Sequence, residues 1–96
     1  MEKILEEFIR LVDQAIEIAQ KKHQELEKSK ANVEMQYFMI LTLRNLKKIK
    51  ENAVSGQLHR PSGGATLGLS YHIGEYFDDE LYDIAWEIDG YYQEKM

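Results

Sequence analysis

Residues 2–28 carry the clearest helical pattern in the chain. Apolar residues recur there at steps of three and four, which places them along one side of a helix with about 3.6 residues per turn. The stripe consists of Leu5, Phe8, Ile9, Val12, Ala15, Ile16, Ala19, His23 and Leu26, and it is widened by Ile4, Leu11 and Ile18. It covers about half of the circumference, which is more than the seam between two helices needs.

A second helix is predicted over residues 33–54, and its character changes along its length. The first part, residues 35–43, reads Met-Gln-Tyr-Phe-Met-Ile-Leu-Thr-Leu and would show apolar side chains on nearly every side of a helix. We therefore expect this part to be surrounded. The apolar side then narrows, and Lys47, Lys48 and Lys50 lie where they suit the C-terminal end of the helix dipole. That interpretation is preferred over a phosphate-binding patch.

Short or glycine-rich segments separate the predicted elements. Residues 29–32 interrupt the helical pattern, and a link this short predicts an antiparallel helical hairpin, with Asn32 as the N-cap of the second helix. Gly56 is expected to end that helix in the left-handed conformation. Residues 56–68 hold the single proline and four of the six glycines, so they predict a loop.

Residues 67–77 fit two patterns. A strand-like alternation is formed by Leu67, Leu69, Tyr71 and Ile73, whereas one side of a helix interrupted at Gly74 would hold Leu69, Ile73, Tyr76 and Phe77. No second strand is available to pair with a first one, and a lone strand would leave its backbone groups unsatisfied. We therefore expect a short helix or an irregular packed turn.

The last helix is predicted over residues 79–93, with Asp78 as its N-cap. Its core side is expected to hold Leu81, Ile84, Ala85, Ile88 and Tyr92, with Tyr91 beside them. The fold class is all-α, with one domain over residues 1–96. It is a small bundle of three main helices: a long antiparallel hairpin, a glycine-rich crossover and a third helix. The wide apolar stripes suggest that a second copy completes this bundle as a homodimer, through the first two helices.

Charge is distributed unevenly along the chain. The net charge is −5, yet residues 75–96 hold eight acidic residues and one base, Lys95. This excess disfavours nucleic acid as a partner of the last helix, because the phosphates would be repelled. The absence of cysteine, an acidic start and the lack of a long apolar run predict a cytoplasmic protein with no membrane segment.

The candidate partner-binding residues lie on the last helix. Tyr82 and Trp86 are four residues apart and point about 100–140° away from Leu81, outside the expected core. The acids expected around them are Asp79, Asp83 and Asp89. Aromatic side chains ringed by carboxylates are typical of a surface that binds a basic protein. Two alternatives remain open: both aromatics pack on residues 67–77, or they mediate self-association.

Catalytic chemistry has weaker support. His72 and Glu75 could share one side of a helical turn, and His59 lies in the glycine-rich loop, but a metal centre would need a second matching pair of ligands. A small metal-dependent or hydrolytic enzyme using this region therefore ranks last. We expect no catalytic residue, no metal site and no cofactor.

Size and charge together favour a non-catalytic protein-interaction protein. Its acidic last helix would bind a protein partner, as in an inhibitor or an immunity-type protein of a bacterial conflict system. The alternative is a structural homodimer with no foreign partner at that surface.

Overall fold

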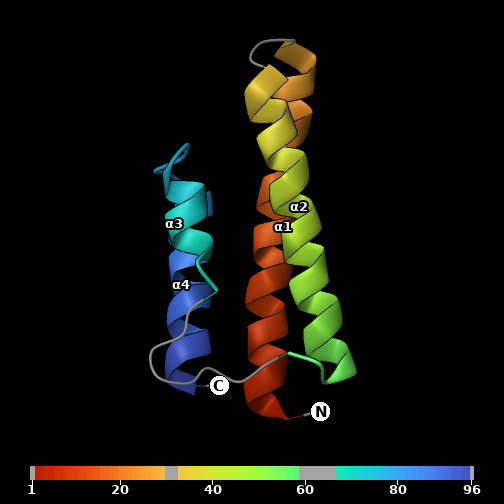
Figure 1. Cartoon of the computed structure of the whole chain (residues 1–96), viewed down its shortest axis with the longest axis vertical. Helices are drawn as coiled ribbons and strands as arrows, with labels where there is room; N and C mark the ends of the chain where they lie inside the picture. Colours follow the sequence, from red (N-terminus) through yellow and green to blue (C-terminus); the bar gives the residue numbers. More distant parts are fainter. Residues whose placement is uncertain (1, 30–32, 59–66, 96) are drawn as a thin grey trace.

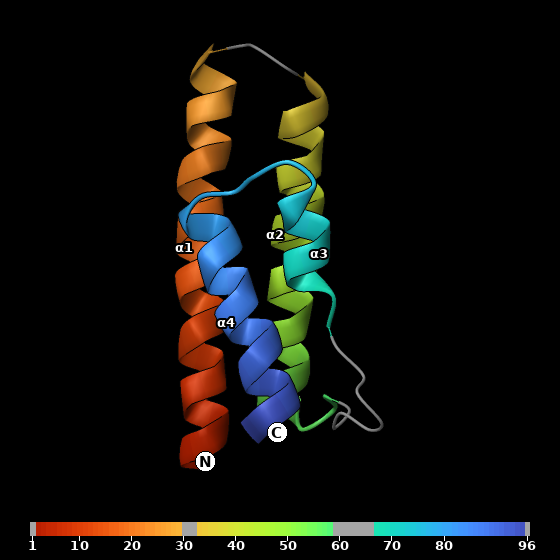
Figure 2. The same ribbon diagram turned by 90° about the vertical axis from the view of Figure 1, so that its left-hand side faces the viewer.

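The computed structural model describes residues 2–29, 33–58 and 67–95 and contains four helices in this part of the chain. They are α1 (Lys3–Ser29), α2 (Val33–Ser55), α3 (Leu69–Gly74) and α4 (Glu80–Lys95). Figures 1 and 2 show two layers: α1 and α2 form an antiparallel hairpin, and α3 and α4 cover one side of it. The all-α bundle expected from the sequence is confirmed.

Polar contacts join α1 and α2 in addition to the apolar core. The amide of Gln36 donates to the carbonyl of Leu26 over 3.2 Å near the link, and Lys50 pairs with Asp13 over 2.7 Å further from it. Gly56 has φ of 77° and ends α2 in the left-handed conformation, as predicted. The wide apolar stripe of residues 2–28 is explained by the packing of α1 against both α2 and α4.

The core lies where α4 crosses the hairpin. Phe8 is fully buried, and its ring centroid lies 6.4 Å from that of Tyr91 and 6.2 Å from that of Tyr92. The Tyr91 hydroxyl donates to the carbonyl of Ile4 over 2.9 Å. The predicted core side of α4 is confirmed, because Leu81, Ile84, Ala85, Ile88 and Tyr92 are all buried.

α3 is the short helix expected between residues 67 and 77, and it depends on α4 for its start. Gly68 precedes it with φ of 71° and provides no side-chain cap. The carboxylate of Asp89 caps the helix instead. It accepts hydrogen bonds from the Leu69 amide at 3.2 Å, the Ser70 amide at 2.8 Å and the Ser70 hydroxyl at 2.7 Å. At the other end Gly74 lets the ring of Tyr82 approach, since a Cβ there would lie 3.0 Å from Tyr82 Cε2.

Phe38 of α2 connects the hairpin to α3. Its ring centroid lies 4.3 Å from Tyr76, 4.8 Å from His72 and 6.2 Å from Phe77. Phe38 is buried, so this aromatic cluster packs α2 against α3 and the residues that follow it.

One local expectation is wrong. The first turn of α4 is capped by Asp79, whose carboxylate accepts the Leu81 amide at 3.1 Å, and the helix begins one residue later than predicted. Within residues 35–43, Tyr37 and Ile40 are exposed in a single chain, and their cover by a second copy stays a prediction. Asn32 and Pro61 lie outside the described residues. Among the described helices, none has the length and apolar composition needed to cross a bilayer.

Asp79 is expected to make stability depend on pH. Burial raises the pKa of Asp79, but the ion pair with Lys22 and the bond from the Leu81 amide outweigh it, so the pKa lies below its ordinary value. A carboxyl group whose pKa is lowered by folding stabilises the folded state at pH values above its pKa in the unfolded chain. This stabilisation is lost as pH falls through its pKa in the folded state. Asp79→Asn, which keeps a capping side chain, should lower the free energy of unfolding by about 0.5–1 kcal/mol above about pH 5.

This loss should shrink as pH falls through the lowered pKa of Asp79 in the folded protein, as followed by urea unfolding at several pH values. Asp78→Asn changes the exposed neighbouring acid and is the control. A difference between wild type and Asp79→Asn that stays constant with pH would show that the Lys22 pair does not favour the charged form.

Candidate protein-binding surface

One side of α4 lies opposite its buried side and is bordered by a groove towards α1 and another towards α3. The five residues on it are Asp83, Trp86, Glu87, Gly90 and Glu94, which together are called the α4 outer face below. At about 100° per residue they lie opposite the buried side of the same helix. Trp86 is the chain's single tryptophan, and 63% of its surface is exposed. A large aromatic side chain left this exposed gains little from folding, so the fold alone does not explain it.

Gly90 forms a depression in the middle of this face. Its φ is not positive, and a Cβ built on it would meet nothing within 4 Å. Neither the backbone conformation nor the packing of the described residues therefore requires glycine, although glycine inside a helix costs about 0.5–1 kcal/mol relative to alanine. The neighbours of a helical residue lie three and four positions away. For Gly90 these neighbours are Trp86, Glu87, Gln93 and Glu94.

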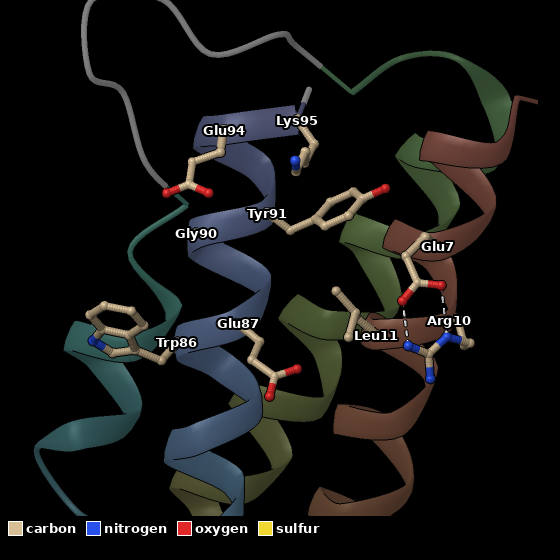
Figure 3. Close-up of a pocket in the computed structure, with 9 residues that line it drawn as sticks. All are labelled: Glu7, Arg10, Leu11, Trp86, Glu87, Gly90, Tyr91, Glu94 and Lys95. Carbon is tan, nitrogen blue, oxygen red and sulfur yellow. Dashed lines mark hydrogen bonds and ion pairs between the residues drawn. The ribbon is translucent and has the colours of Figure 1, made fainter.

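Grooves reach this depression from both sides. A groove of about 370 Å³ runs between α1 and α4, and a smaller one of about 210 Å³ runs between α3 and α4. Both are bordered by Trp86 and Gly90. Figure 3 shows Gly90 between Trp86 and Glu94 along α4, with Glu87 pointing towards α1. A side chain from another molecule could therefore reach the glycine against the edge of the indole.

The larger groove is lined by three acids, Glu7, Glu87 and Glu94, and by two bases, Arg10 and Lys95. On α1, Arg10 donates to both carboxylate oxygens of Glu7, and the hydrogen bond with Arg10 lowers the pKa of Glu7. This pair neutralises itself, as the dashed lines in Figure 3 indicate. Asp83 and Glu94 form no ion pair with another residue in the described ranges, so their charge is available to a partner.

The structure separates the residues that the sequence grouped around the two aromatics. Trp86 and Asp83 lie on the α4 outer face, whereas Tyr82 is half-buried against Gly74, as one alternative expected. Asp79 is part of the Lys22 pair and the helix cap. Asp89 is only 7% exposed and holds the start of α3, so it does not belong to an exposed rim. The surface proposed below therefore keeps Trp86 and Asp83 from the predicted set.

The possible metal ligands do not gather into a site in the described part of the chain. His72 packs against Phe38, and its Nε2 atom is buried without a hydrogen-bond partner among the described residues. Glu75 is exposed at the end of α3. No group of three potential metal-binding side chains occurs within the ranges that the structure describes. His59 lies outside them.

No protein-family model, no curated protein and no solved structure matches this chain. A function is therefore inferred from the surface itself.

Three residues of this surface were not predicted from the sequence as partner-binding residues: Glu87, Gly90 and Glu94. The available signal was Gly90, a glycine in the interior of a strongly patterned helix, which usually has a packing or functional reason. Its helical neighbours at three and four positions would have included both glutamates.

Proposed function

We propose that this chain is a small protein-interaction domain that binds a basic protein through the α4 outer face. The observation that carries the proposal is the exposed indole of Trp86 beside the Gly90 depression. Tryptophan is among the residues that most often dominate the energy of a protein interface. The small size and the acidity of the chain favour an inhibitor or an immunity-type protein among protein-binding domains.

The charges around Trp86 support a basic partner. Asp83 and Glu87 lie within one helical turn of Trp86, and Glu94 lies eight residues away; the segment they belong to holds the negative excess of the chain. Such a rim accelerates association with positive surfaces and repels acidic ones. A cation on the partner could also lie over the exposed indole face, an interaction worth about 0.5–2 kcal/mol.

Affinity capture with matched variants tests this function. The baits are the wild type, Trp86→Ala and Tyr71→Ala, and the prey is an extract of the cells that produce the chain. Tyr71 is the control because it is an aromatic residue on α3 that is 80% exposed. We expect a basic protein that is retained by wild type and Tyr71→Ala, is lost with Trp86→Ala and is released by salt. With the purified partner, loss of the indole should weaken binding by at least about thirtyfold, equivalent to about 2 kcal/mol.

Stability measurements separate binding from folding at the same surface. Trp86→Ala should change the free energy of unfolding by no more than about 0.5 kcal/mol, as expected for an exposed site. Gly90→Ala should raise it by about 0.5–1 kcal/mol, because alanine favours the helix and meets no neighbour. The same Gly90→Ala variant should bind the partner more weakly. Retention of one unchanged set of proteins by all three baits would count against the proposal.

A further inference from the structure

The outward side of α2 is a second surface that one chain leaves uncovered. Three apolar residues form its first half, Val33, Tyr37 and Ile40, and three bases follow, Arg44, Lys47 and Lys48; these six are called the α2 outer face. Val33 is 75%, Tyr37 63% and Ile40 41% exposed. The three bases form no ion pair with any residue in the described ranges.

The two outer faces have opposite charge and lie on opposite layers of the molecule. α3 and α4 lie on one side of the hairpin (Figures 1 and 2), and each outer face lies opposite the buried side of its own helix. Both helices run in the same direction along the long axis. A second copy shifted sideways from the first would therefore bring its α2 alongside α4 in parallel.

The residue types on the two faces are complementary in this parallel arrangement. Trp86, Gly90 and Glu94 follow one another at four-residue steps, as Ile40, Arg44 and Lys48 do. When the two faces are aligned in register, Trp86 lies against Ile40 and Glu94 against Lys48 of the other copy. Arg44 then lies over the Gly90 depression, between the carboxylates of Glu87 and Glu94.

We propose that a second copy of this chain occupies the α4 outer face, placing its own α2 outer face there in parallel. This rests on the proposed function of the α4 outer face as a protein-binding surface and names the partner. The chain as a whole has a net charge of −5, but its α2 outer face is locally basic, and that face is what the acidic rim would meet. Because two different faces meet, the contact is head to tail, and each bound copy leaves one face of each kind free. Association is therefore open-ended and grows with concentration rather than stopping at a closed dimer.

Sedimentation velocity on single variants and on their mixture tests this arrangement. The average mass of wild type should rise from micromolar to millimolar concentration and fall with added salt. Trp86→Ala changes only the α4 outer face, and Arg44→Glu changes only the α2 outer face; each should weaken self-association by about tenfold or more. Tyr71→Ala should associate like wild type.

The mixture gives the decisive result. An equimolar mixture of Trp86→Ala and Arg44→Glu should form a complex of one copy of each, because one variant offers an intact α2 outer face and the other an intact α4 outer face. That complex should not grow further, since both of its free faces carry substitutions. Circular dichroism confirms that each variant is folded.

Three results overturn the proposal: a monomeric wild type at millimolar concentration, self-association of Trp86→Ala equal to that of wild type, or a mixture that does not combine. None of them depends on the capture experiment, in which a foreign basic protein retained by wild type and lost with Trp86→Ala would support the proposed function by itself.

Discussion

Replacing Asp89 by alanine is expected to lower the free energy of unfolding by about 2–4 kcal/mol, a large share of the stability of a domain this small. The carboxylate accepts three hydrogen bonds from Leu69 and Ser70, and it is 7% exposed. Alanine would leave those donors without their acceptor at the start of α3. Bonds to a charged acceptor are worth more than bonds to a neutral one, and unsatisfied buried donors add to the loss.

Two further variants show whether this loss belongs to the cap. Asp89→Asn keeps one acceptor oxygen and should cost about half as much as alanine. Asp83→Ala removes an exposed acid from the same helix and should change the free energy of unfolding by no more than about 0.5 kcal/mol. Urea unfolding monitored by circular dichroism provides all three values. Equal values for the alanine variants at 83 and 89 would contradict the capping role.

Replacing Phe38 by alanine is expected to cost about 3–4 kcal/mol, the usual loss for a buried aromatic side chain. The ring packs against Tyr76, His72 and Phe77 and so joins α2 to α3. Alanine would remove these contacts and leave a cavity between the two layers. Chemical unfolding gives the loss in free energy.

Tyr37→Ala is a matched control because it changes the adjacent residue of the same helix. Tyr37 is exposed, so the substitution should cost no more than about 0.5 kcal/mol in a dilute monomer. Both variants introduce alanine into α2, and any gain in helix propensity is similar for the two. A cost for Tyr37→Ala as large as that for Phe38→Ala would show that the outer side of α2 is buried in solution.

The helices were predictable from sequence because the information that specifies them is local. The three-and-four spacing of Leu5, Phe8 and Val12 places them on one side of a helix whatever lies opposite. Gly56 ends α2 for an equally local reason, its left-handed backbone. The short helix between residues 67 and 77 followed from the lack of a partner strand.

The candidate site was less predictable, because burial of a side chain depends on segments distant in sequence. Tyr82 and Trp86 differ by only about 40° around the helix, yet α3 covers one and leaves the other exposed. Asp89 lies next to the apolar side of α4, and only the position of α3 decides whether its carboxylate meets water or amides. The sequence predicted that residues 35–43 need more cover than three helices give, but not that Tyr37 and Ile40 are the residues left exposed, since that depends on where α3 and α4 lie.

The capping of α3 by α4 has a consequence for how the chain fluctuates. Six residues are too few for a stable helix in isolation, and the first amides of α3 are held by a side chain about twenty positions later. α3 should therefore unfold whenever α4 opens. The opening free energy measured by amide hydrogen exchange should then be no higher in α3 than in α4. Because Asp89 immediately precedes Gly90, a molecule bound on the far side of α4 would slow exchange in a helix that it never touches.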